Sequence, residues 1–388
     1  MKRLAFFLVP LALLAGGSAL AQSFIPFGAR SVALGNAAIG LGGDEPESAL
    51  DNPAATDQSR AKAAISLGGV GVEQGEFRAP LELITGNDPN ALAAGASNLN
   101  DVVGALRTLA LEGGGVVGTG RSGFMAGYQG YAVGYVDTSW SGSRARTDLT
   151  RIQSGNDPAT SIRNNASTVA FRGLTLKDTS VSAAFTLVTG VTVGVAGHWL
   201  SGTTSSKEES VFTTEVGNPF QLARRGLAGT ERTRTRFSWD AGVLITYGIV
   251  KVGGVMKAIN EPAFPFDEES GPLPDRGRSV KLSRQTRIGA SVKIPGIGIV
   301  VAADADLATS ETLVDGLMSR EIGGGLEWGI GPIVIRGGIS TNLEAPDAAK
   351  ILSAGFGVRL GPVHADGAAV YRTSSRAVGG VLTLRASM

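Results

Sequence analysis

The feature that most constrains this chain is an alternation of apolar and small or polar residues that recurs from residue 62 to the C-terminus. In GVTVGVAGHWL, residues 190–200, Val191, Val193 and Val195 fall on one face, and Gly194 and His198 fall on the other. Residues 237–247 and 297–306 repeat the pattern, with Leu244 as an exception. A period of two with one apolar face is typical of half-buried β-strands.

The connections between these segments alternate in length. Tight links fall at 129–130, 189–190, 248, 295–296, 330–331 and 361, and each is followed by a strand and then a longer loop. Short turns on one side and long loops on the other are typical of outer-membrane barrels, whose apolar face contacts lipid. A soluble sandwich has no reason to sort its loops in this way.

We therefore predict an all-β fold, a transmembrane antiparallel β-barrel of about 14 strands over residues 61–388, with both termini on the periplasmic side. Residues 165–188 can be split at 174–178, but one long strand preserves the alternation. The expected strands are 62–73, 115–128, 131–150, 165–188, 191–207, 229–247, 249–260, 278–294, 297–308, 317–329, 331–341, 350–360, 362–371 and 377–387.

The N-terminus reads as a secretory signal peptide over residues 1–21. Lys2 and Arg3 precede an apolar run from Leu4 to Leu14, and small residues lead to Ala19-Leu20-Ala21. The run is shorter than the roughly 20 residues of a membrane-spanning helix. The sequence predicts a chain that is exported through the inner membrane of a Gram-negative bacterium and resides in the outer membrane.

Composition excludes several other classes of protein. Lys and Arg number 35 against 34 Asp and Glu, so the basic excess of a nucleic-acid-binding protein is missing. Two histidines and no cysteine leave little material for a catalytic triad or a zinc site, and His198 and His364 are expected on lumen faces. We expect no enzyme activity, no cofactor and no metal.

Before the first strand lies GARSVALGNAAIGLGGDEPESALDNPAA, residues 28–55, which is built almost wholly from small residues. Such a stretch has no core of its own, but it can pack closely against other backbone because its side chains are small. A barrel of 14 strands has a wider bore than one of eight, which its own side chains fill. We interpret residues 22–60 as a plug, or hatch, in the lumen.

This stretch resembles the N-terminal hatch of FadL-type outer-membrane hydrocarbon transporters, a superfamily that includes TraF-like and PorV-like barrels. The residues that carry the resemblance are Gly28, Arg30, Gly35, Gly40, Asn52, Pro53 and Ala54. The segments VVAADADLATS and LEWGIGPIVIRGGI resemble the C-terminal half of TraF-like barrels, where an acidic strand precedes a Glu-aromatic turn and an Arg-Gly strand. The resemblance implies an outer-membrane barrel, and it implies a substrate much less specifically.

The long connection after the first strand holds a helical pattern, which we place on the outer side near residues 81–112. Apolar residues recur there at three- and four-residue spacing. One reading is a lid that captures an apolar ligand, and the other is an amphipathic helix that caps the barrel rim. The candidate ligand contacts are Leu92, Leu99, Val103 and Leu106.

Charged residues in the expected lumen offer two readings. Arg232, Arg234 and Arg236 form a ladder near the outer end of one strand, and forked guanidinium groups suit a carboxylate head group or a lipid phosphate. The alternative is a salt-bridged lumen wall, with opposite charges supplied across the bore by Asp240, Asp304, Asp306, Arg336, Asp366 and Arg372. Asp304 and Asp306 are too few ligands for calcium.

Two short motifs carry no function in this reading. Gly113–Gly118 matches G-x-G-x-x-G, but a helix precedes it and a strand follows, which is the reverse of a dinucleotide site. The sequon at Asn165 has no use outside a eukaryotic secretory pathway.

Two functions remain open. The first is passive FadL-like transport of hydrophobic small molecules, such as fatty acids or hydrocarbons, across the outer membrane past a movable hatch. The second is a structural or docking barrel of a secretion or conjugation system, as in PorV-like or TraF-like proteins. The expected partners are outer-membrane lipid, a hydrophobic small molecule and secretion-system proteins, without nucleic acid.

Overall fold

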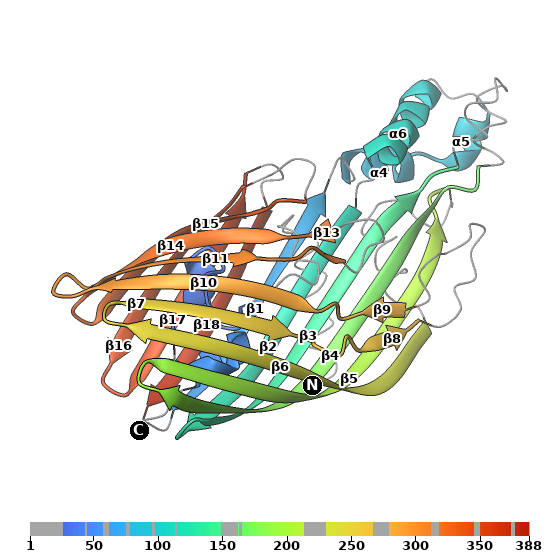
Figure 1. Ribbon diagram of the computed structural model, residues 1–388. Coiled ribbons are helices and arrows are strands. Elements are labelled where there is room, and N and C mark those ends of the chain that lie inside the picture. The colour runs from blue at the N-terminus through green and yellow to red at the C-terminus, as the bar shows by residue number, and fades with distance from the viewer. Residues whose placement is uncertain are drawn as a thin grey trace.

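In the computed structural model the chain forms a closed antiparallel barrel of 14 strands, with β1 paired to β18 (Figure 1). The structure describes residues 26–42, 45–56, 62–74, 78–94, 98–112, 115–148, 162, 165–212, 230–266, 279–311, 318–344, 350–373 and 377–387. The expected signal peptide, residues 1–21, lies outside them. The barrel strands are β1 (Lys62–Gln74), β2 (Gly115–Tyr128), β3 (Tyr131–Arg146), β4 (Thr168–Val188), β5 (Val191–Ser210), β6 (Thr230–Tyr247), β7 (Val250–Lys257), β10 (Gln285–Ile294), β11 (Ile299–Asp306), β14 (Glu321–Ile330), β15 (Ile333–Asn342), β16 (Lys350–Leu360), β17 (Val363–Arg372) and β18 (Ala377–Ser387).

Each predicted tight link is a hairpin turn with a glycine in the left-handed region. The φ values are +83° at Gly130, +84° at Gly190, +58° at Gly248, +83° at Gly296, +59° at Gly331 and +60° at Gly361. Glycine reaches this region without a Cβ clash, and two-residue hairpin turns require it. The interpretation of residues 165–188 as one strand is also confirmed, because β4 pairs continuously with β3 from Thr168 to Ala183.

The two faces of the barrel separate apolar from polar side chains. Trp199 and Val195 of β5 are about half exposed on the outside, at 53% and 50%, whereas His198 on the inner face is 8% exposed. Leu244, the exception in the alternation, is buried on the inner face against Ala54 and Ala55. An outward apolar band of this kind is the surface that a barrel presents to lipid.

Two predicted strands are shorter than expected because part of each pairs elsewhere. Residues 278–294 divide into β9 (Ser279–Lys281) and β10, since β9 pairs with β8 (Ala263–Pro265) instead of continuing the wall. Residues 317–329 likewise divide into β13 (Met318–Ser319), which pairs with β12 (Ser310–Glu311), and β14. The β8–β9 hairpin packs Phe264, Phe266 and Val280 against Leu174, Leu176 and Leu200.

Six helices complete the described structure, and they form two groups. Three short ones, α2 (Ala29–Ala33), α3 (Ser48–Asp51) and the 3-10 helix η1 (Pro53–Ala55), lie inside the barrel (Figure 1). The others, α4 (Arg78–Thr85), α5 (Pro89–Ala93) and α6 (Leu99–Glu112), lie beyond the loop end. Within the described ranges, the helices lack the length and apolar character needed to cross a bilayer.

Candidate functional site

The N-terminal segment, defined here as residues 26–42 and 45–56, fills part of the barrel bore. All of these residues are buried, although the segment is too small to form a core alone. Its contacts reach strands around the wall, from Ser66 on β1 and Ser182 on β4 to Thr383 on β18. The segment is therefore buried by the barrel and held by polar groups on its inner face.

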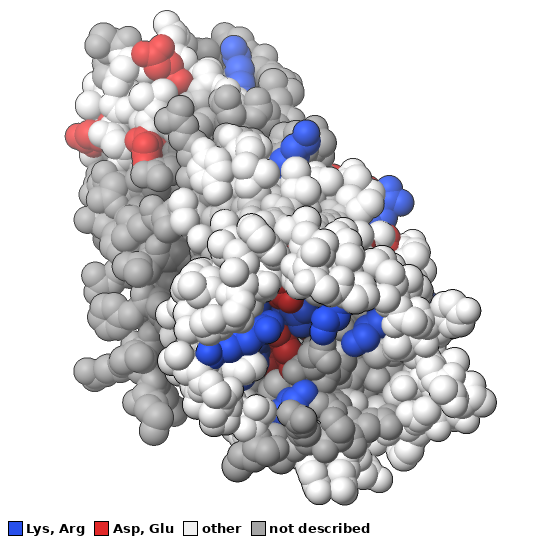
Figure 2. All heavy atoms as spheres, turned by 90° about the vertical axis from the view of Figure 1, so that its left-hand side faces the viewer, with Lys and Arg blue, Asp and Glu red and all other residues white. Residues whose placement is uncertain are grey.

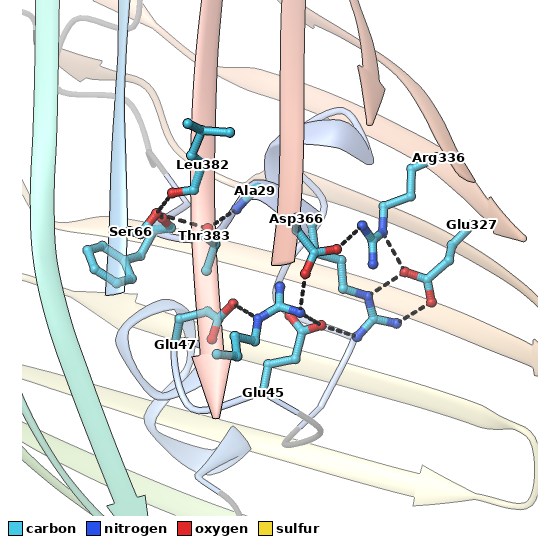
Figure 3. Close-up of polar contacts among 12 residues, drawn as sticks. Ala29, Glu45, Glu47, Ser66, Glu327, Arg336, Asp366, Leu382 and Thr383 are labelled. Carbon is cyan, nitrogen blue, oxygen red and sulfur yellow. Dashed lines mark hydrogen bonds and ion pairs between the residues drawn. The ribbon is translucent and has the colours of Figure 1, made fainter. Parts of the chain in front are cut away.

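A network of three arginines and four carboxyl groups ties this segment to β14, β15, β17 and β18 (Figure 3). Arg30 Nε donates to Glu327 at 2.7 Å, and Arg336 Nε donates to the same carboxylate at 2.7 Å. Arg336 also contacts Asp366, which accepts a bond of 2.8 Å from Arg385. Arg385 closes the network on Glu45 and Glu47.

Backbone groups of the segment are satisfied by side chains from the wall. The Asp304 carboxylate accepts from the amides of Ala38 and Ile39 at 2.7 and 2.9 Å. Thr383 accepts from the Ala29 amide at 2.9 Å, and Ser291 donates to the Gly40 carbonyl at 2.7 Å. Since buried backbone groups need partners, these wall residues fix the path of the segment.

The Asn52-Pro53-Ala54 motif has a local and a long-range role. The Asn52 side chain accepts from the Ala54 amide at 3.0 Å and donates to the Val243 carbonyl of β6 at 3.1 Å. Opposite it, a Cβ on Gly194 would stand 2.3 Å from the Ala54 nitrogen. Gly35 has a φ of +68°, and a Cβ there would stand 2.5 Å from the Ile339 carbonyl oxygen. At Gly194 and at Gly35, the backbone of the N-terminal segment therefore contacts the backbone of the barrel wall directly.

Burial raises the pKa of two carboxyl groups of the segment. Burial raises the pKa of Glu47 from 4.5 to about 7, although the positive charge of Arg385 opposes the shift. Burial likewise raises the pKa of Asp51 to about 6 against the attraction of Lys257 and Arg121. The network contains three arginines and four carboxyl groups. A proton on Glu47 therefore brings the net charge of the network to zero.

The predicted lumen acids are paired, but not with the arginine ladder. Asp304 and Asp306 flank the fully buried Arg287 at 3.5 and 3.3 Å, and Arg287 also donates to the Asn36 carbonyl. Arg234 and Arg236 are exposed. The reading that opposite charges across the bore neutralise the ladder is therefore wrong for these two residues. β6 pairs with β7 only from Ala241 onward, so its outer half extends beyond β7 while it remains paired with β5.

The candidate ligand contacts of the outer loop form part of a small core. Leu92 and Leu106 are buried, and Leu99 and Val103 pack beside them. The cluster also includes Leu81, Ile84, Val102, Leu109, Ile162, Val169, Phe171 and Val211. The expected single helical stretch is divided among α4, α5 and α6. The direct role of these four side chains in ligand capture stays a prediction.

Sequence reasoning missed a second charged cluster, centred on His198. Its Nδ1 lies 2.9 Å from Asp178 and its Nε2 lies 3.2 Å from Asp240. Nδ1 is within hydrogen-bond distance of the Asp178 carboxylate, and Nε2 lies at ion-pair distance from that of Asp240. Within the described residues, no group of His, Asp and Glu is arranged to hold a metal ion.

Two cavities adjoin the N-terminal segment. The first, the wall cavity, measures about 40 Å³ and lies between the segment and β1, β2 and β15–β18, with mostly apolar lining from Phe27, Val32, Ile351, Val370 and Val381. The second, the central cavity, measures about 140 Å³ and lies between the segment and the β8–β9 hairpin. Its lining includes Leu50, Trp140, Leu200, Asp178, His198, Ser238, Asp240, Lys257 and Leu282.

The tight-turn end of the barrel is hollowed, with basic side chains around the hollow and acidic ones deeper (Figure 2). The basic residues at the strand ends on this side are Lys62 and Lys251, which are partly exposed, and Lys293 and Arg359, which are exposed. None of the six tight turns carries an acidic residue. This rim therefore carries a concentration of positive charge.

The motifs that carried the resemblance, one in the N-terminal segment and one on β14 and β15, lie next to each other in the structure. Several residues that bond to them had only weak signals in the sequence. Glu327 and Arg336 are register partners on β14 and β15. The Glu327 carboxylate accepts hydrogen bonds from both Arg30 and Arg336. Glu45, Glu47, Arg287 and Arg385 escaped notice because nothing local marks them. A charged residue at an inward position of a strand was the one available signal, and it does not reveal a partner.

The architecture agrees with solved structures over nearly the whole chain. The toluene transporter TbuX of Ralstonia pickettii matches with a TM-score of 0.53 at 14% identity, covering 94% of this chain and 99% of that one. A TodX monoaromatic hydrocarbon channel, the deltaS2 mutant, matches with a TM-score of 0.50 at 10% identity, covering 94% and 98%. The chain therefore shares the barrel fold of these two proteins.

The amino-acid sequence identifies the family of this chain. The family model described as F plasmid transfer operon, TraF, protein matches residues 49–306, about two thirds of the chain. The chain belongs to this family. No curated protein matches it in sequence.

Proposed function

We propose that this protein is a FadL-like passage for small hydrophobic molecules across the outer membrane. The observation that carries the proposal is the wall cavity, where apolar side chains of the N-terminal segment face apolar and glycine positions of β1 and β16–β18. TbuX and TodX, which share the fold, are described as a toluene transporter and a monoaromatic hydrocarbon channel.

Passage requires movement at this cavity. Its volume of about 40 Å³ is well below the roughly 150 Å³ of a cavity known to bind benzene. We infer that Phe27 and Val32, at the start of the N-terminal segment, shift to admit a ring while the ion network holds the rest. The segment then acts as a gate.

Uptake by cells tests this function. Cells that carry the gene should accumulate labelled toluene or a labelled fatty acid faster than cells without it. Val381→Trp fills the wall cavity and should abolish the difference. Val378→Trp is the control, because Val378 is exposed on the outer face of the same strand. Equal uptake with and without the gene would refute the proposal.

A second candidate is a docking barrel of a conjugation or secretion system. Membership of the TraF family and the basic rim at the tight-turn end favour it. Crosslinking in cells from a cysteine at Lys293, followed by identification of the linked protein, tests it against a cysteine at exposed Val378. A specific partner linked only from the rim, with unchanged hydrocarbon uptake, would make docking the function.

A further inference from the structure

The outer half of β6 extends beyond β7 and has a free edge (Figure 1). β7 pairs with β6 only as far as Ala241, whereas β5 remains paired with the outer half. Just beyond Ala241, the Ile259 amide donates to the Trp239 carbonyl at 2.9 Å, and the Asn260 side chain donates to the Phe237 carbonyl at 2.7 Å. Farther along, none of the described strands pairs with this edge. The backbone carbonyls there need other partners.

Two arginines of β6 provide those partners. Arg236 donates from Nη1 to the Thr235 carbonyl and from Nε to the Ala263 carbonyl of β8, both at 3.1 Å. Arg234 donates from Nη1 to the Thr233 carbonyl at 3.3 Å. These bonds hold both guanidinium groups at the free edge, where both residues are exposed. Each guanidinium keeps further N–H donors for a ligand.

Nearby carboxylates leave the charge of these two arginines in place. Within the described residues, neither arginine forms an ion pair. Glu261 is paired with Lys281 at 2.8 Å, and Glu209 is paired with Lys207 at 2.6 Å. Glu231 alternates with the arginines along β6 and lies on the opposite face of the strand. The free edge therefore carries two positive charges that are accessible to an anion.

The apolar band on the outside of the barrel ends beside this edge. The outward residues of β6 are apolar from Tyr247 to Phe237 and polar from Thr235 onward. Trp199 of β5 is the register partner of Phe237, and their ring centroids lie 5.2 Å apart. The Phe237 and Trp239 rings follow at 4.6 Å. Aromatic girdles of this kind flank the apolar band at the membrane interface.

The chemistry of the edge matches a phosphorylated lipid. Arg236 directly precedes Phe237 in the chain, so the guanidinium groups lie next to the border between acyl chains and head groups. Forked N–H donors of arginine suit phosphate oxygens. With the long loops on the outer side, as the sequence predicts, the lipid at this border is lipopolysaccharide, whose lipid A part carries phosphate groups.

We propose that Arg234 and Arg236 bind a phosphate group of lipid A in the outer leaflet. The guanidinium groups hold the phosphate, and the acyl chains lie against the rings of Trp199, Phe237 and Trp239. The bound lipid covers the free edge of β6 and fixes it at the membrane surface. This site is independent of the passage proposed above, because it involves neither the N-terminal segment nor the wall cavity.

Lipid A binding to the purified full-length chain in phosphatidylcholine nanodiscs, measured by native mass spectrometry, tests the site. Phosphorylated lipid A should bind about tenfold or more tightly than lipid A from which the phosphates have been removed, as charge-assisted hydrogen bonds predict. Arg234→Gln combined with Arg236→Gln should remove that difference and leave binding of the dephosphorylated lipid unchanged. Higher salt should weaken binding of the phosphorylated form alone.

The matched control is Lys293→Gln combined with Arg359→Gln, which removes two exposed positive charges at the tight-turn end. This variant should bind phosphorylated lipid A as the unaltered chain does. Equal binding of the two forms of lipid A, unchanged binding in the Arg234 and Arg236 variant, or an equal loss in the control would overturn the proposal. Competition by inorganic phosphate at the same concentration as lipid A would also overturn it, because the site would then select a free anion.

Discussion

At the residue scale, a network of buried charges holds the N-terminal segment to the wall. Arg336 is 4% exposed and links Glu327, which holds Arg30, to Asp366, which holds Arg385. Burying such groups is costly, and their mutual contacts offset that cost only while every partner is present. The removal of one member therefore has a larger effect than the removal of an exposed pair.

Arg336→Met should weaken the attachment of the segment by about 3–5 kcal/mol, because it leaves Glu327 and Asp366 buried with fewer partners. Hydrogen exchange at the amides of Ala38 and Ile39, which donate to Asp304, reports the detachment. Lys251→Met is the control, with an expected loss below about 1 kcal/mol, since the partly exposed Lys251 bonds the segment through the Leu41 carbonyl alone among the described residues. Equal effects of the two variants would contradict this account.

The raised pKa of Glu47 makes the attachment depend on pH. Between its ordinary value of 4.5 and about 7, the docked segment binds a proton that a detached one releases, so attachment weakens as pH rises through this range. The raised pKa of Asp51 adds a slope of the same sign up to about 6. Hydrogen exchange of residues 28–52 at pH 5 and pH 8 should show this. Glu47→Gln should reduce the difference, and an unchanged difference would refute its assignment to Glu47.

At the scale of elements, glycines in the wall decide where the segment can touch the barrel. Gly194 on β5 faces Pro53 and Ala54 of η1, and their backbone atoms lie where a Cβ would stand. Close approach of two backbones excludes any side chain between them. The contact therefore requires both the small residues of the segment and the glycines of the wall.

Gly194→Ala should displace η1 and destabilise the docked segment by roughly 1–3 kcal/mol, the usual cost of overpacking. Exchange of the Ala54 amide, which donates to the Asn52 side chain at 3.0 Å, measures the loss. Gly120→Ala on β2 serves as the control, since a Cβ there meets no atom within 4 Å. If the two variants exchange alike, the contact at Gly194 does not hold the segment.

At the scale of the whole molecule, the bore is narrowed at two levels. The N-terminal segment lies toward the tight turns, and the β8–β9 hairpin packs Phe264 against the inner wall toward the long loops. The central cavity lies between them. The closed wall thus surrounds two elements packed on its inner face, with the central cavity between them.

Deletion of residues 26–56 should raise conductance in planar bilayers, because it removes the obstruction nearest the tight turns. A further deletion of residues 263–281 should raise it again by opening the other level. Arg234→Ala serves as a control, since this exposed arginine lies outside both obstructions. If the first deletion leaves conductance unchanged, the segment does not block the bore.

The sequence by itself determined the barrel. Alternation in 191–200 set the two faces, and single glycines such as Gly190 and Gly248 set the turns, because strand period and left-handed φ are local properties. It also marked Arg30 and Asn52. Only the tertiary structure decided the partners of Arg30, the division of 278–294, and the meeting of Asp178, His198 and Asp240. The partners of Arg30 depend on where the N-terminal segment meets the wall, and the meeting of Asp178, His198 and Asp240 depends on the register of the adjacent strands β4, β5 and β6, which no local property of the sequence fixes.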